Sequence, residues 1–382
     1  MSDTHAIREV ATRIKSAARF SAIFGTLPKG DTKAMRGALR KQFSYLARVV
    51  HPDHAPPPYA AEAAEAFRLL NELRHAAEDA IERGAYDAPI TPHASASTNT
   101  EAETSEIVTA RGSYRLKQTA FREGDFSILY RGTFAGAKPP AILAKIAREP
   151  ALNSWLEKEA VLLRQVADAK ARSPLFGISP FLPSLLDTVL VEGDKGTRYR
   201  TNIYRFVPDM VSVADIIAAY PRGLDAPQAA WVARRIFAQP LAASMLGVVH
   251  GSITPDHVLV NPFTHEPLHT GWPHAQKSGR ITHVVDRWKD IYPPEVFDKK
   301  DADHRTDIYM AGATTVRLLG GDVGSKSLPA SVPSEVRQIL LHTLEQSPAR
   351  RPQDGRLLLD EFTRVVREKW GRVYRPLTMP IR

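Results

Sequence analysis

The sequence predicts a multidomain chain, in which an all-α helical hairpin precedes an α+β domain. Three observations predict this layout: helical spacing of apolar residues in the N-terminal part, a polar stretch after it, and short β-rich runs followed by long helical runs. The 382 residues provide room for two or three domains, each with its own core. We predict an N-terminal helix at 1–19, a helical domain at 20–86, a linker at 87–112, an α+β domain at 113–372 and a tail at 373–382.

The helical domain is predicted from the spacing of its apolar residues. Ile7, Val10 and Ile14 lie at helical intervals on the N-terminal helix. Asp31 or Thr32 is placed to cap a second helix. Its apolar face comprises Met35, Leu39, Phe43, Leu46, Val49 and Val50. After the prolines at 56–58, a third helix has an apolar face formed by Ala63, Phe67, Leu70, Leu73 and Ala77. Two such helices form a stable hairpin when their apolar faces meet.

The linker is predicted from composition. The stretch at 92–106 has no aromatic side chain and almost no aliphatic one. Such a segment buries too little apolar surface to offset the entropy lost on ordering it. We therefore place the main domain boundary within 87–112.

The second domain begins with strand patterns and continues with helical ones. Strands are expected at 114–121, 127–134, 140–146, 188–192 and 198–206, with a turn at 193–196 between the last two. Helices are expected at 151–169, 228–246, 306–319, 334–344 and 355–370. A run of strands followed by a run of helices is typical of the α+β class.

Composition narrows the possible functions. The chain has no cysteine, which excludes disulfides and thiolate metal sites. It has no apolar run near the roughly 18 residues that span a bilayer, and its first residues lack an apolar signal core. We therefore expect a cytoplasmic protein without a membrane partner. The net charge of +9 favours acidic partners weakly, but no basic stripe interleaved with aromatics predicts a nucleic-acid partner.

The triplet His51-Pro52-Asp53 lies between the second and third predicted helices. Basic residues on the helix before it are Arg36, Arg40, Lys41 and Arg48. The segments Phe20-Ser-Ala-Ile-Phe-Gly25 and Ala66-Phe67-Arg68-Leu69-Leu70-Asn71-Glu72 flank this region. Together these features resemble a J domain over about 20–86.

The resemblance implies that the domain binds a DnaK-type chaperone and stimulates its ATPase. It assigns chaperone binding to His51, Pro52 and Asp53 and to the four basic residues of the preceding helix. Pro52 would fix the loop backbone, and Asp53 would present a carboxylate to a cationic partner. The basic helix face would steer the domain toward an acidic chaperone surface. A chance occurrence of the triplet is the alternative.

The second domain resembles the bilobal fold of protein kinases over about 114–370. The resemblance pairs Lys145, on a strand, with Glu159, on a helix, and gives this pair the role of holding nucleotide phosphates. It also pairs Glu295 with Arg351 and lets Asp307 steady the backbone after His250. These residues occur in the segments Ala141–Lys145, Glu157–Leu163, Tyr292–Glu295, Asp307–Gly312 and Arg350–Pro352.

The residues that perform phosphotransfer are replaced. The resemblance places Ser252 at the catalytic-base position, His257 at the metal-binding asparagine and Gly271 at the metal-binding aspartate. Neutral serine is a poor proton acceptor, and magnesium prefers oxygen ligands. Asp125 lies in a reduced glycine-rich loop, where it would repel phosphates. We therefore expect a pseudokinase with no catalytic residue, metal or cofactor, although ATP binding without turnover at Lys145 and Glu159 stays open.

The sequence thus predicts a co-chaperone whose kinase-like domain is a scaffold for an unknown client or partner protein. The alternative is an atypical kinase or phosphotransferase with a rearranged site, in which Asp256 replaces a lost carboxylate. Nucleic-acid binding through the basic C-terminal part is a third, weaker hypothesis. A zinc site is not expected, because there is no cysteine and scattered loop or core residues are the interpretation for the set His250, His257, His265, His269, His274 and His283.

Overall fold

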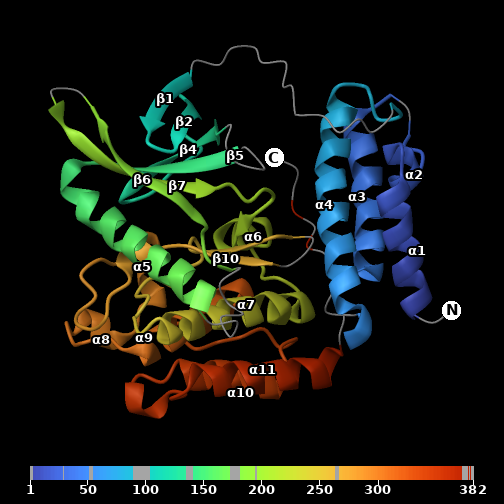
Figure 1. Cartoon of the computed structure of the whole chain (residues 1–382). Helices are drawn as coiled ribbons and strands as arrows, with labels where there is room; N and C mark the ends of the chain where they lie inside the picture. The colour runs from blue at the N-terminus through green and yellow to red at the C-terminus, as the bar shows by residue number, and fades with distance from the viewer. Residues whose placement is uncertain are drawn as a thin grey trace. The chain divides into compact units, whose positions relative to one another are not determined.

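The computed structural model describes two compact units. One comprises Met1–Thr98 with Arg372–Pro376, and the other Asn99–Gly371 with Leu377–Arg382. The boundary falls within the predicted linker, and Figure 1 labels the elements of both units. The residues described are 3–28, 30–50, 55–88, 104–134, 141–172, 181–193, 196–262, 266–371, 377 and 379. His51, Pro52, Asp53 and His265 lie outside them. Within these ranges, no helix is long and apolar enough to cross a membrane.

The first unit is built from helices. They are α1 (Asp3–Ser16), α2 (Phe20–Phe24), α3 (Thr32–Val49) and α4 (Ala60–Glu82). The Asp31 carboxylate accepts a hydrogen bond from the Lys33 backbone N–H and so caps α3. Helices α3 and α4 pack together, and α1 packs against both of them through its buried face of Ile7, Val10, Ala11 and Ile14. The helix predicted separately at 1–19 is therefore part of the same compact unit.

The buried face of α4 differs from its prediction at one position. Arg74 is buried, whereas Leu73, which the pattern assigned to the core, is half-buried. The Arg74 guanidinium lies 5.1 Å from the centroid of the Phe43 ring. Its Nη1 donates to Glu78 Oε1 at 2.9 Å. The aromatic ring and the carboxylate together compensate for burying the charge, which a pattern of apolar residues does not register.

The second unit begins with an antiparallel sheet. Its strands are β1 (Thr104–Thr109), β2 (Gly112–Lys117), β3 (Arg122–Glu123), β4 (Ser127–Phe134), β5 (Ala141–Ala147), β6 (Leu185–Glu192) and β7 (Arg198–Arg205). Their order is β1-β2-β4-β5-β7-β6, and β3 pairs with β4. Helix α5 (Asn153–Arg172) packs against β6 and β7. This contact places one face of α5 against the end of the sheet that β7 and β6 form.

The end of the predicted linker is a strand. Thr104–Thr109 pair in continuous antiparallel register with Gly112–Lys117. Ile107 is buried in the core of the sheet, whereas Val108 is exposed. The prediction of a linker over 87–112 is therefore wrong from residue 104 onward. Backbone pairing at a sheet edge, together with one buried isoleucine, is enough to order this polar segment.

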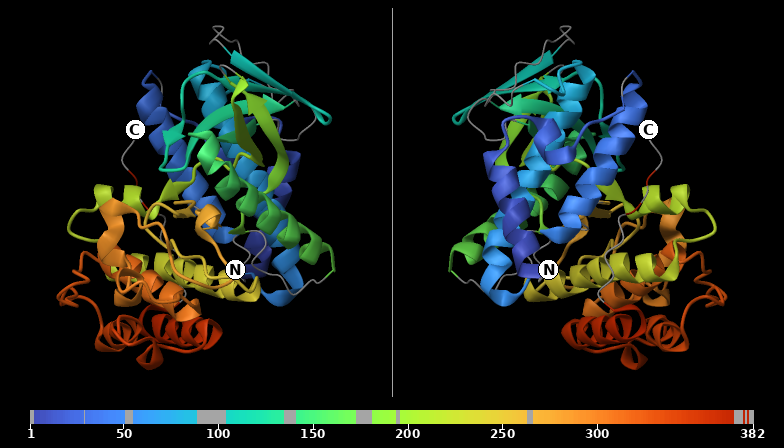
Figure 2. Two further views of the ribbon diagram at one scale, coloured as in Figure 1. Left: turned by 90° about the vertical axis from the view of Figure 1, so that its left-hand side faces the viewer. Right: turned by 90° about the vertical axis from the view of Figure 1, so that its right-hand side faces the viewer.

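Helices form the rest of the second unit. They are α6 (Val213–Ala219), α7 (Ala226–Met245), α8 (Pro294–Phe297), α9 (His304–Leu318), α10 (Ser334–Thr343) and α11 (Gly355–Trp370). A small sheet joins β8 (Val211–Ser212), β9 (Val258–Val260) and β10 (Pro267–His269) in the order β10-β9-β8. Both views in Figure 2 show the large sheet at one end of this unit and the red C-terminal helices at the other. The chain is therefore a helical unit followed by an α+β unit, as predicted.

Candidate functional site

The basic residues predicted to share one face of α3 lie on two different faces of the helix. Arg36 forms an ion pair with Glu82, and Arg40 Nε lies 3.8 Å from Glu78 Oε1, so both arginines are directed to the C-terminal part of α4. These contacts show that α3 and α4 run antiparallel. Lys41, Tyr45 and Arg48 are exposed and repeat at helical spacing on another face. The exposed face therefore contains two of the four basic residues that the sequence assigned to it.

Lys145 and Glu159 meet in the second unit, β5 supplying the lysine and α5 the glutamate. Lys145 Nζ lies 2.9 Å from Glu159 Oε1 and 2.8 Å from Oε2. The glutamate side chain is 2 % exposed, and its Oε2 also accepts a hydrogen bond of 2.8 Å from the Tyr204 hydroxyl. Burial and the nearby carboxylate raise the pKa of Tyr204 well above its usual range. The pair thus joins the sheet to the helix, and the glutamate carboxylate balances the positive charge of the lysine.

A second buried ion pair lies among the helices. Arg351 Nη1 and Nη2 donate to the two carboxylate oxygens of Glu295 at 2.6 and 2.8 Å, and both side chains are buried. Thr306 Oγ1 donates to the same carboxylate at 3.0 Å. This bidentate geometry is the strong form of an arginine–carboxylate contact.

Asp307 holds the backbone at the start of the segment that carries Ser252 and His257. Its carboxylate accepts the backbone N–H groups of His250 and Gly251 at 2.7 and 2.9 Å. Burial raises the pKa of Asp307 to about 7. The aspartate thus fixes the turn from which the next residues project.

Ser252 and His257 contact each other. Ser252 Oγ lies 2.9 Å from His257 Nδ1, and the same nitrogen lies 2.9 Å from the Ser252 carbonyl oxygen. Because that carbonyl only accepts, Nδ1 carries the proton and donates to it. Burial lowers the pKa of His257, so the ring is neutral. With Nδ1 protonated, the imidazole is not placed to remove the Ser252 proton.

Gly271 is enclosed by histidine rings. Its φ of 87° lies in the left-handed region that favours glycine. A Cβ at this position would lie 2.6 Å from His257 Cγ and 3.1 Å from His250 Cε1. The His257 ring therefore occupies the space that a larger side chain at position 271 would need. An aspartate does not fit here while the ring keeps its place.

Phe126 packs against several neighbouring aromatic and histidine rings. Its ring stacks on Trp155 at 4.5 Å and lies 4.9 Å from His274 and 4.5 Å from His283, measured between ring centroids. The rings of His257 and His274 are 5.4 Å apart. Burial lowers the pKa of His274 well below its usual range. These residues, with Lys145, Glu159 and Gly271, are called the Lys145 site below.

The residues of the Lys145 site do not fit a magnesium nucleotide. The positions that the resemblance assigns to metal ligands hold Gly271 and a neutral His257 ring, and Phe126 packs onto His274 and His283. Asp256, the candidate replacement carboxylate, accepts from Trp288 Nε1 at 2.6 Å and pairs with Arg287. In the described ranges, no group of three histidine, aspartate or glutamate side chains is arranged to hold a metal ion.

Sequence reasoning did not identify the aromatic packing of Phe126 or the interlock of Gly271 with His257. The residues involved come from separate segments, so no local spacing connects them. A signal was present in the set of histidines between 250 and 283, which was considered only as a set of zinc ligands. Comparison with known proteins adds no assignment: no family model matches the chain, and no curated protein matches it in sequence.

Proposed function

We propose that this chain is a co-chaperone, whose helical unit engages a DnaK-type chaperone and stimulates its ATPase. The observation that carries the proposal is the antiparallel α3–α4 pair, whose connecting segment contains His51-Pro52-Asp53. The Arg36–Glu82 contact joins the N-terminal part of α3 to the end of α4, whereas the exposed Lys41, Tyr45 and Arg48 lie in the C-terminal half of α3, which precedes the triplet in the sequence. A basic face of this kind favours an acidic partner surface.

The second unit has the role of an inactive, kinase-like scaffold that binds a client or partner protein. Support comes from the Lys145 site, where Gly271 and the His257 ring stand at the positions that the resemblance assigns to metal ligands. The paired Lys145 and Glu159 join sheet and helix without any ligand. Any ATP hydrolysis linked to this chain would then take place in the chaperone.

The first test measures ATP hydrolysis by a DnaK-type chaperone with and without the full chain. We expect stimulation by the unaltered chain and none by His51→Gln. The matched control is His342→Gln, which makes the same substitution at an exposed position of α10. Equal stimulation by the His51→Gln and unaltered chains would refute the proposal.

A second test uses the division of the basic residues on α3. Lys41→Glu and Arg48→Glu alter the exposed face and are expected to weaken stimulation strongly. Arg36→Glu alters a residue that already pairs with α4, so a smaller loss is expected. Circular dichroism of each variant checks that the helices remain folded. A larger loss for Arg36→Glu would place the chaperone surface elsewhere.

The alternative, an atypical phosphotransferase, is favoured by one contact, the Lys145–Glu159 pair. It predicts that millimolar Mg-ATP raises the melting temperature of the chain and that Lys145→Met removes this shift. We expect no shift for the unaltered chain, because Phe126, His257 and His274 pack together in the Lys145 site. A clear Lys145-dependent shift would show that the second unit binds nucleotide.

A further inference from the structure

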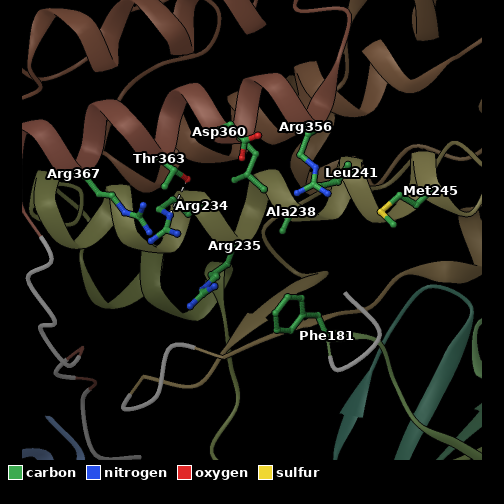
Figure 3. Close-up of a pocket in the computed structure, with 11 residues that line it drawn as sticks. Phe181, Arg234, Arg235, Ala238, Leu241, Met245, Arg356, Asp360, Thr363 and Arg367 are labelled. Carbon is green, nitrogen blue, oxygen red and sulfur yellow. Dashed lines mark hydrogen bonds between the residues drawn. The ribbon is translucent and has the colours of Figure 1, made fainter. Parts of the chain in front are cut away.

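A pocket lies between α7 and α11 in the second unit. Its volume is about 420 Å³. Figure 3 shows the side chains around it, which come from both helices and from Phe181. The lining residues are Phe181, Arg234, Arg235, Ala238, Leu241, Met245, Arg356, Leu359, Asp360, Thr363 and Arg367. This set is called the arginine pocket below.

The two helices that form the arginine pocket run antiparallel. Arg234 Nε donates to Thr363 Oγ1 at 3.1 Å, whereas Gly355 lies beside Leu241. Arg234 begins, and Met245 ends, one row of side chains at helical spacing along α7. The facing row on α11 runs from Arg356 to Arg367. Eleven residues at 1.5 Å each make both rows about 16 Å long.

Positive charge is present at both ends of the arginine pocket. In the view of Figure 3, Arg234 and Arg367 lie at one end, and Arg356 lies toward the other, near Leu241. Four arginines and one aspartate line the pocket, which gives a local charge of +3 (four minus one). Arg356 and Arg367 are exposed and so are accessible to a ligand. The pocket therefore favours a ligand with two separated negative charges.

Apolar side chains line the rest of the pocket, namely Phe181, Ala238, Leu241, Met245 and Leu359. Ala238 and Leu359 lie between the charged ends, whereas Met245 lies beyond Arg356 in Figure 3. A single inorganic phosphate reaches the arginines of one end only and leaves this surface uncovered. A nucleic-acid backbone brings no apolar group to cover it. A peptide segment in which an apolar side chain is flanked by acidic side chains matches the whole lining of the pocket.

We propose that the arginine pocket binds an extended acidic peptide segment of a partner protein. An extended chain advances about 3.4 Å per residue, so two carboxylates about 16 Å apart are about five residues apart in sequence. The segment would place acidic side chains at the two arginine ends and an apolar side chain on the surface between them. This inference rests on the scaffold role proposed above and names the partner class.

The test uses the full chain and a fluorescein-labelled peptide of about eight residues, with glutamates about five positions apart and leucines between them. Fluorescence anisotropy at physiological salt measures its affinity. The Arg356→Glu/Arg367→Glu variant is expected to bind at least about tenfold more weakly. Arg222→Glu/Arg364→Glu, with the same charge change at exposed residues outside the lining, should bind as the unaltered chain does.

Further arms of the same assay identify the ligand class. A peptide with glutamines in place of the glutamates should lose binding, and so should one with serines in place of the leucines. The proposal is overturned if both double variants bind alike, if either control peptide binds as well, or if only a single-stranded RNA or inorganic phosphate binds. Chaperone stimulation is measured separately, so a failure of peptide binding is distinguishable from a failure of the co-chaperone proposal.

Discussion

Two regions of the second unit differ in how they stabilise buried charged groups. Around Glu295, Arg351 and Asp307, buried charged groups meet ionic or backbone partners at hydrogen-bond distance. This region is called the frame below. In the Lys145 site, by contrast, one ion pair is surrounded by neutral imidazole and aromatic rings. The difference teaches that this fold stabilises buried charge in two ways, by ionic and backbone partners in the frame and by one ion pair among neutral rings in the Lys145 site.

Acid should affect the buried histidines most, of which His257 and His274 belong to the Lys145 site. Burial lowers the pKa values of His250, His257, His269 and His274 in the folded chain. The unfolded chain binds protons at these rings more readily, so the free energy of unfolding falls as the pH drops below the usual histidine pKa of about 6.5.

The frame has the opposite pH dependence. Asp307, with a folded-state pKa of about 7, binds a proton more tightly when folded, so its contribution to stability increases by about 2 kcal/mol from pH 7 to pH 5. The four histidines outnumber the single aspartate, so a net loss of stability is expected from pH 7 to pH 5, measured by urea unfolding. His250→Gln should reduce the loss, and the exposed His342→Gln should not. Equal stability at pH 7 and pH 5 would contradict this account.

Removal of one partner from the frame should have the next largest effect. Arg351→Ala leaves the Glu295 carboxylate buried without its cation, which is expected to lower the free energy of unfolding by about 3–5 kcal/mol. Arg364→Ala removes an exposed arginine that pairs with Glu368, and it should cost about 0.5 kcal/mol or less. Urea unfolding of both variants makes the comparison. Similar values would mean that the frame does not depend on the buried pair.

Gly271→Asp tests the close packing of Gly271 against the His257 ring in the Lys145 site. The new Cβ meets the His257 ring, and the positive φ adds strain, so a loss of about 2–3 kcal/mol is expected. Adding His257→Ala removes the clash, and the double variant should be more stable than the two separate losses predict, by about 1 kcal/mol. Strict additivity in urea unfolding would show that the two positions do not interact.

The smallest effect is expected at the exposed rim of the Lys145 site. His283 Nε2 lies 3.2 Å from Asp125 Oδ2, and both side chains are partly exposed. Asp125→Asn should therefore change the free energy of unfolding by about 0.5 kcal/mol or less. A change as large as that of Gly271→Asp would show that the rim contact, and not the ring packing, holds this region together.

Much of the fold follows from local patterns. Ser127–Phe134 form a strand with the predicted bounds, and Gly355–Trp370 form a helix with the predicted bounds. The Lys145–Glu159, Glu295–Arg351 and Asp307 contacts agree with the pairings that the kinase resemblance implied. In these cases the pattern of a segment, or a motif with a fixed partner, was enough to predict the element or the contact.

The failures share a physical cause, which is dependence on distant residues. The strand at Thr104–Thr109 owes its order to pairing with β2, and Arg74 is buried because Phe43 lies over its guanidinium. The arginine pocket combines α7 with a helix more than a hundred residues later. Contacts of this kind have no local period or spacing for a sequence pattern to detect.

The fit of Gly271 against His257 has a consequence for the order in which substitutions can accumulate in this chain. A single substitution that places a carboxylate at position 271 first passes through a destabilised protein, because the His257 ring is in the way. Replacement of His257 alone introduces no carboxylate there. A carboxylate at position 271 therefore needs two changes, with the replacement of His257 first.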